Sequence, residues 1–285
     1  MKYQIINGKM LLKEEALIPL NDLGLLRSYS IFDFFRVLSG VPVFLEDHLD
    51  RLLGSVDKME LDLRWSKDEI RTMCREIIAS NEVVDAGLRI VVTGGYSHDG
   101  YTPARANIYM MMHNLPEYSP DDFTQGRKMI SSNFTRDLPE AKTTLYVHAI
   151  HHQKRMKEVN AIEILYHTDG VITEGSRANM FFVDQNDVIV TPADAILRGI
   201  TRRHLMHVAK DKYNIVERTM VMDEIADMKE AFLTSSTKGV LPVIEIGGVV
   251  IGDGKVGAIT SDLHQLFNAH VAEYITAHRE EFDDS

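Results

Sequence analysis

The segment 113–122 constrains the fold of this chain more than any other, because it interrupts an otherwise periodic sequence. It reads HNLPEYSPDD, with two prolines, three acidic residues and no apolar period. Such a composition is typical of a linker between independently packed regions. A chain of 285 residues is also long for one core and short for three. We therefore predict two domains, 1–116 and 117–285.

The first predicted domain combines short strands with two amphipathic helices. Alternating apolar residues predict strands at 3–7, 10–12, 31–38, 41–45, 87–93 and 106–112. Segments 47–59 and 66–80 have a helical period instead. Ser66 is followed by Glu69, the spacing of a capping box, so we expect the second helix to begin there. These elements predict a small α+β domain.

The second predicted domain alternates strands irregularly with helices. Helical periodicity is found at 146–158, 200–212 and 261–279. The pairs at 169–170 (DG) and 247–248 (GG) predict hairpin turns. Residues 280–285 form an acidic tail, which we expect to be frayed.

Charge, hydropathy and cysteine content exclude several classes of protein. A formal charge of −11 argues against a nucleic-acid or anionic-membrane partner, because no basic stripe is available to neutralise phosphates. No apolar run reaches about 18 residues, the length that a spanning helix needs. We expect a cytoplasmic protein without an export signal. Cys74 is the only cysteine, which excludes an intrachain disulfide and a cysteine-based metal cage, and we expect a half-buried structural thiol there.

Lys142 and Glu174 carry the most chemical information in the sequence. Pyridoxal phosphate needs an amine that forms a covalent bond with its aldehyde, and a carboxylate that keeps its pyridine nitrogen protonated. Lys142 and Glu174 are residues of these two types, and Glu174 is followed at once by GSRAN at 175–179. Lysine and glutamate are common as surface charges, so the motifs around them decide the interpretation.

Further motifs accompany this pair along nearly the whole chain. They are LEDHLDRL at 45–52, KTTLY at 142–146, Glu163, VITEGS at 171–176, Asn179, Phe181, LRGITR at 197–202 and TSST at 234–237. In this order they resemble the class IV aminotransferases, also called fold-type IV pyridoxal-phosphate enzymes. The resemblance implies an α+β fold of two domains: a small α/β sandwich, and a larger pseudo-barrel that carries the cofactor lysine.

The resemblance also implies which residues contact pyridoxal 5'-phosphate. Lys142 would anchor the cofactor and, as a free amine, move a proton during transamination. Glu174 would face the pyridine nitrogen, and Tyr146 matches a position where several relatives hold a tyrosine near the ring hydroxyl. A tyrosine packed in the core is the alternative for Tyr146.

A cup for the cofactor phosphate is implied in the same way. Gly199-Ile200-Thr201 opens a helical segment, whose first amides can face an anion. The family's cup matches this chain at Arg51, Ile200, Thr201, Ser236 and Thr237. A simple threonine cap, a polar loop and a surface arginine are the alternatives.

The substrate-binding residues depart from the family pattern. Well-known D-amino acid aminotransferases trap the substrate carboxylate with a Pro-Arg-x-His signature, but the matching stretch at 98–101 reads HDGY. Arg27 and Arg177 occur where many relatives have other residues. Because a guanidinium pair can hold a carboxylate by bidentate bonds, we predict that these two arginines bind the substrate. The arrangement resembles a non-standard subgroup of D-amino acid aminotransferases. Two surface arginines are the alternative.

These observations predict transamination between a D-amino acid, of the D-alanine or D-glutamate type, and a 2-oxo acid such as 2-oxoglutarate. A branched-chain L-amino acid aminotransferase remains an alternative, although its expected Tyr or Phe-Glu-Gly motif is FDFFR at 32–36. Aminodeoxychorismate lyase, which shares the lysine, the glutamate and the cup, is another. A catalytically idle cofactor-binding protein is a third.

The resemblance further implies a homodimer, with the cofactor between domains and loops of the neighbouring subunit closing the pocket. We expect no metal. His148, His151 and His152 have the spacing of one helix face, but no carboxylate or cysteine completes a ligand set. A solvated helix face explains the three histidines more simply.

Overall fold

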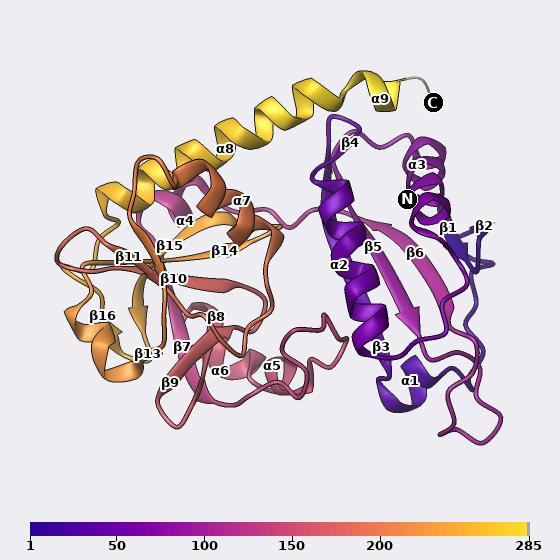
Figure 1. Ribbon diagram of the computed structural model, residues 1–285, viewed down its shortest axis with the longest axis horizontal. Coiled ribbons are helices and arrows are strands. Elements are labelled where there is room, and N and C mark those ends of the chain that lie inside the picture. The colour runs from indigo at the N-terminus through magenta and orange to yellow at the C-terminus, as the bar shows by residue number, and fades with distance from the viewer. Residues whose placement is uncertain (284–285) are drawn as a thin grey trace. The chain divides into compact units, whose positions relative to one another are not determined.

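The computed structural model describes residues 1–283, and the contacts within it divide the chain into two compact units. Unit 1 contains Met1–Pro116, Ala141–Leu145 and the C-terminal segment from Val271. Unit 2 contains Glu117–Glu140 and Tyr146–His270. Figure 1 shows the helices and strands of each.

Unit 1 is built on a six-stranded antiparallel sheet in the order β2-β1-β6-β5-β3-β4. The strands are β1 Tyr3–Ile6, β2 Lys9–Leu12, β3 Ser30–Leu38, β4 Val41–Pro42, β5 Ala86–Thr93 and β6 Asn107–His113. A short helix, α1 (Leu23–Arg27), precedes β3. The strand predicted at 41–45 is shorter than expected, because Phe44 adopts a left-handed conformation and the next helix begins at Leu45.

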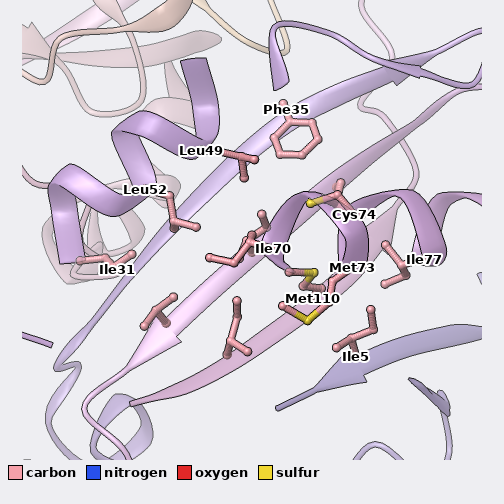
Figure 2. Packing of buried hydrophobic residues seen from close by; sticks show 14 of the residues in the cluster. Ile5, Ile31, Phe35, Leu49, Leu52, Ile70, Met73, Cys74, Ile77 and Met110 are labelled. Atoms are coloured by element: carbon pink, nitrogen blue, oxygen red, sulfur yellow. The ribbon is translucent and has the colours of Figure 1, made fainter. Parts of the chain in front are cut away.

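Two helices pack on this sheet, α2 (Leu45–Lys58) against β3 and α3 (Lys67–Asn81) against β1 and β6 (Figure 1). The predicted capping box of Ser66 and Glu69 at the start of α3 is confirmed. Figure 2 shows the core between helices and sheet, where α2 and α3 each contribute an apolar face. The labelled residues are Ile5, Ile31, Phe35, Leu49, Leu52, Ile70, Met73, Cys74, Ile77 and Met110.

The segment 141–145, which contains Lys142, belongs to unit 1, whereas the sequence predicts it within the second domain. Strand β3 pairs with β4 only at its C-terminal end, so its first residues have an open edge. The Phe32 amide donates to the Lys142 carbonyl (2.8 Å), and the Thr144 amide donates to the Ser30 carbonyl (3.0 Å). The segment therefore adds to the sheet by backbone hydrogen bonds. The residues around Lys142 contain no pattern from which this pairing could be predicted.

The C-terminal end of the chain also belongs to unit 1. The ring of Tyr274 packs edge-on against Phe44, with 4.8 Å between centroids, and Arg75 lies over the ring of Phe282. The predicted frayed tail contains a short helix, α9 (Glu280–Asp283). Residues 284–285 of that tail lie outside the described residues.

Unit 2 contains a ten-stranded mixed sheet, with the path β12-β11-β10-β14-β15-β7-β8-β9-β13 and β16 paired to β15. The strands are β7 Arg127–Asn133, β8 Ala161–Thr168, β9 Val171–Gly175, β10 Asn179–Val183, β11 Ile189–Thr191, β12 Ile215–Glu217, β13 Met220–Val221, β14 Glu230–Ser235, β15 Gly239–Ile246 and β16 Val249–Val250. Its core includes the stacked rings of Phe181 and Phe232. The predicted hairpin turns follow β8 and β15.

The helices between residues 117 and 278 are α4 Pro120–Thr124, α5 Val147–His151, α6 Gln153–Glu158, α7 Ile200–Ala209, the 3-10 helix η1 Met222–Asp227 and α8 Ala258–His278. Two of them differ from the prediction. The expected linker contains α4, which Ser119 and Asp122 cap. The helix expected at 146–158 is interrupted at His152, whose backbone leaves the helical conformation. Within residues 1–283 we find no helix long and apolar enough to cross a membrane.

Candidate active site

Glu174 lies at the end of β9 with both carboxylate oxygens occupied. Its side chain is buried. Oε1 accepts a hydrogen bond from Arg136 Nε (2.7 Å), and Oε2 accepts one from the Leu197 amide (2.8 Å). The carboxylate is thereby fixed in one orientation. Sequence reasoning missed Arg136, because it lies 38 residues before Glu174 in an irregular segment.

The start of α7 has the properties of an anion site. The first amides of a helix have no acceptor within that helix, and its dipole favours negative charge there. Gly199 caps α7 and has no side chain to accept from those amides. A Cβ at Gly199 would lie 2.2 Å from Asn179 Oδ1, so a larger residue would force that side chain or the backbone to shift. Asn179 also donates from Nδ2 to the Leu197 carbonyl (2.8 Å), which ties β10 to the approach to α7.

Four hydroxyl groups of unit 2 can add to these amides. Thr201 is buried in the first turn of α7, and α7 packs against β14. Ser236 and Thr237 form the turn between β14 and β15. The buried Thr234 Oγ1 has no hydrogen-bond partner among the described residues. Amides at a helix start, together with hydroxyls, are the donors that a phosphate monoester needs, so these residues of unit 2 fit the predicted phosphate cup.

Arg51 projects from α2 in unit 1 and forms a fork with Asp33. Its Nε lies 2.8 Å from Asp33 Oδ2, and its Nη2 lies 2.7 Å from Oδ1. His48 Nδ1 lies 2.7 Å from the same Oδ1. Burial alone would raise the pKa of Asp33, but the charges of Arg51 and His48 hold it well below its ordinary value. The role of Arg51 in the phosphate cup stays a prediction.

Lys142 is held by its backbone on both sides. The Lys142 amide donates to Ser55 Oγ (3.2 Å) from α2, and its carbonyl accepts from Phe32. Its Nζ lies 4.7 Å from the centre of the Phe32 ring. The backbone of the predicted catalytic residue is therefore fixed to β3 and α2, and its amine lies over the ring of Phe32.

Tyr146 follows Lys142 by four residues but belongs to unit 2. It is half-buried against the cluster formed by Ile130, Ala149, Met156, Ile164 and Tyr166. Burial raises the pKa of Tyr146, and the nearby charge of Arg136 opposes that rise. Its hydroxyl is thus protonated at neutral pH, as a donor to a ring oxygen would need to be.

The two predicted substrate arginines lie in different units. Arg27 is the last residue of α1, is exposed, and donates from Nη1 to the Leu26 carbonyl (3.0 Å). Arg177 lies in the turn from β9 to β10, where its Nε is 3.3 Å from Glu163 Oε2.

His148 is one of the three histidines for which we expect no metal. Its ring stacks on Phe134, and its Nε2 lies 2.9 Å from Ser132 Oγ.

Comparison with known proteins decides the family. The family model of class IV amino-transferases matches residues 30–246 of this chain. The chain belongs to the class IV aminotransferases. It is thus a pyridoxal-phosphate-dependent aminotransferase, as the motifs predicted, and the predicted cofactor is confirmed.

Individual relatives of the aminotransferase extend over almost all of its length. It is 27% identical to a D-alanine aminotransferase of Bacillus licheniformis, over 91% of this chain and 93% of the relative. It is 28% identical to a putative branched-chain-amino-acid aminotransferase of Methanocaldococcus jannaschii, over 92% of this chain and 94% of the relative.

Solved structures confirm the predicted α+β, fold-type IV architecture. The T.th. branched-chain amino acid aminotransferase with pyridoxamine 5'-phosphate superposes with a TM-score of 0.88 at 23% identity, over 96% of each chain. The Escherichia coli branched-chain enzyme gives a TM-score of 0.87 at 23% identity, over 94% of each chain. At this identity the likeness concerns the fold. The roles of individual site residues and the domain bounds stay predictions.

Proposed function

We propose that this aminotransferase exchanges an amino group between a D-amino acid, of the D-alanine or D-glutamate type, and a 2-oxo acid such as 2-oxoglutarate. The observation that carries the proposal is the guanidinium of Arg177, which is held through Nε by Glu163 and leaves its two terminal nitrogens without a partner among residues 1–283. Such an edge can bind a substrate carboxylate by two parallel hydrogen bonds. The similarity to D-alanine aminotransferases of several bacteria supports the D preference.

Each predicted site residue then has one task. When bound, pyridoxal phosphate supplies an electron sink that acidifies the hydrogen on the substrate α-carbon. The Lys142 amine would take that proton from the substrate α-carbon and act as the proton carrier of the reaction. Glu174, oriented by Arg136 and the Leu197 amide, keeps a negative charge opposite the pyridine nitrogen. The amides of Ile200 and Thr201, with the hydroxyls of the β14–β15 turn, hold the phosphate, and we keep Arg51 as its further partner.

A branched-chain L-amino acid aminotransferase is the second candidate, because one relative of similar identity has that name. The residues FDFFR at 32–36 weigh against it. Parallel assays of D-alanine with 2-oxoglutarate and of L-leucine or L-glutamate with a matching 2-oxo acid separate the two. We expect pyruvate and glutamate from the first assay. Turnover of the L-substrates only would replace our proposal with the branched-chain activity, and catalytic pyruvate release without any acceptor would indicate a lyase.

The role of Arg177 has its own test. Arg177→Ala should raise KM for D-alanine by about tenfold or more, because a charge-assisted bidentate pair is lost. Arg155→Ala is the matched control, since Arg155 is exposed on α6 of the same unit. An unchanged KM in the Arg177 variant would contradict the role. The same measurement on Arg27→Ala tests the other predicted arginine.

We also propose a homodimer. Large apolar side chains are exposed along one stretch of unit 1, namely Leu17, Ile18, Leu20, Leu25 and Leu26. Contiguous exposed apolar residues mark interaction surfaces in stable proteins. Sedimentation of the purified holoenzyme should give twice the chain mass, and Leu20→Glu with Leu25→Glu should shift it towards the monomer. The cytoplasmic location stays a prediction.

A further inference from the structure

Glu163 is a buried carboxylate that ties together two separate turns of unit 2. It lies in β8 and is completely shielded from solvent. Its Oε1 accepts hydrogen bonds from the Ser176 hydroxyl and from the Ile164 amide. Its Oε2 lies 3.3 Å from Lys238 Nζ and 3.3 Å from Arg177 Nε. One oxygen is therefore shared by two cations that come from different turns.

Lys238 is an almost completely buried lysine. Its side chain is 2% exposed, and Glu163 is its ion-pair partner. It follows Ser236 and Thr237 in the turn between β14 and β15. A buried charge is costly unless it is paired, so Lys238 and Glu163 depend on each other. This pair links the turn of the predicted phosphate cup to the turn that carries Arg177.

Arg177 is the exposed end of this cluster. Its side chain is half-exposed, although Glu163 is fully buried. The Glu163 carboxylate raises the pKa of Arg177. Burial alone would raise the pKa of Glu163, but Lys238, Arg177 and the hydrogen bonds from Ser176 and Ile164 hold it below its ordinary value. Glu163 and Arg177 are therefore charged at neutral pH, and one carboxylate beside two basic side chains gives the cluster a formal net charge of about +1.

This charge distribution points to an anion at the open edge of Arg177. Oε2 binds Nε, which leaves the Nη1 and Nη2 edge directed away from Glu163. The negative charge of Glu163 would be expected to neutralise Arg177 and weaken its attraction for an anion. Lys238 cancels that charge from the buried side. The guanidinium is thereby both fixed in orientation and effectively cationic.

We propose that Glu163 and Lys238 are positioning residues that together present Arg177 to the carboxylate of the amino acid substrate. Glu163 fixes the guanidinium, and Lys238 offsets the charge of Glu163. This inference rests on the proposed function, because it assigns partners to the substrate-binding role of Arg177. It extends that function by making carboxylate affinity depend on two residues that do not touch the substrate.

The test separates orientation from net charge. Glu163→Leu with Lys238→Met removes one negative and one positive charge, so the cluster keeps its net charge while Arg177 loses its anchor. The double change also avoids leaving a buried charge unpaired, which either single variant would do. Asp122→Asn with Arg127→Met is the matched control, since it removes another ion pair of unit 2, with 2.6 Å between charged atoms.

Two measurements on the holoenzyme report the result. The first is KM and kcat for D-alanine, and the second is the calorimetric Kd of propanoate, with propanamide as the neutral analogue. The double variant should raise KM and the propanoate Kd by about tenfold, the scale of a charge-assisted hydrogen bond, and change kcat by less than about threefold. Propanamide binding and the control variant should stay at wild-type values.

Unchanged KM and propanoate affinity in the double variant would overturn the inference, and so would unchanged values in Arg177→Ala. A tighter propanoate affinity would overturn it as well, because Glu163 would then act only as an opposing charge. If the wild type does not turn over D-alanine, the proposed function fails, while the propanoate measurement still tests whether Glu163 and Lys238 govern carboxylate binding at Arg177. Full-length folding is monitored by circular dichroism for every variant.

Discussion

Arg136 and Glu174 form a buried ion pair in unit 2, with 2.7 Å between Arg136 Nε and Glu174 Oε1. The side chain of Glu174 is 6% exposed and that of Arg136 is 13% exposed. The Leu197 amide holds the other carboxylate oxygen. A carboxylate fixed in this way keeps its direction when a positive partner binds, so its electrostatic effect costs no reorganisation.

Glu174→Gln should therefore lower kcat on the order of 10²-fold, because a neutral amide cannot support a protonated pyridine nitrogen. The affinity for the cofactor should change much less. Steady-state kinetics with cofactor titration of the apoenzyme gives both quantities. Arg136→Leu should produce a smaller loss of kcat, since the charge at 174 is kept and only its orientation is released. A Glu174→Gln enzyme with wild-type kcat would contradict this assignment.

Lys142 is expected to be the residue that bonds covalently to the cofactor. Borohydride reduction of the holoenzyme, followed by peptide mapping, should place the label on Lys142. Lys142→Ala should give no label and lose at least about 10²-fold in activity. Lys154→Arg, an exposed position on α6, is the control and should behave as wild type. A label on another side chain would refute the role of Lys142.

Gly199→Ala tests the anion site at the start of α7. The added Cβ would lie 2.2 Å from Asn179 Oδ1, so the backbone or Asn179 must move. We expect the Kd of the cofactor to rise by about tenfold or more, because amide donors at a helix start act through their position. Gly54→Ala in α2 is the control: no atom lies within 4 Å of its added Cβ, and helix propensity predicts a gain of about 0.5–1 kcal/mol in stability. Equal cofactor affinities of Gly199→Ala and wild type would contradict an anion site at the start of α7.

His48 should make the folded protein sensitive to mild acid. Burial lowers the pKa of His48 below its ordinary value, and the opposing effect of Asp33 does not restore it. As pH falls below about 6.5, the usual pKa of histidine, the unfolded chain gains a proton at this position that the folded chain does not, so stability decreases.

Urea unfolding at pH 7.5 and 5.5 measures this effect. The loss of unfolding free energy between these two pH values should be smaller in His48→Gln than in wild type, by up to about 1.4 kcal/mol. His151→Gln, at an exposed helix position, serves as the control and should keep the wild-type difference. Identical pH dependences of His48→Gln and wild type would show that His48 does not titrate as described.

Cys74 should be unreactive in the folded protein. It is completely buried within the core of unit 1, and burial raises the pKa of its thiol. Because the thiolate is the reactive form, a thiol reagent should modify Cys74 only after unfolding. Complete labelling in native buffer, at the rate found in urea, would contradict the burial of Cys74. The expectation of a half-buried thiol is wrong, because the face of α3 that carries Cys74 packs into the core of unit 1.

Local sequence determined the features that depend on neighbouring residues. The capping box of Ser66 and Glu69 and the glycine before α7 could be predicted, because helix ends are governed by interactions over three or four residues. The apolar periods of α2 and α3 predicted their buried faces for the same reason. The order of the motifs around Lys142 and Glu174 was sufficient to predict the family and its cofactor.

Only the tertiary structure decided which distant residues meet. The segment of Lys142 joins β3 through backbone hydrogen bonds, and backbone pairing has no residue signature. Arg136 reaches Glu174, and Glu163 joins Lys238 to Arg177, across separations that no local pattern encodes. Burial makes these pairings necessary, since a shielded charge must find an opposite charge wherever the fold brings one. The residue types could be read from the chain, but their partners were set by the tertiary fold, which brings residues far apart in sequence into contact.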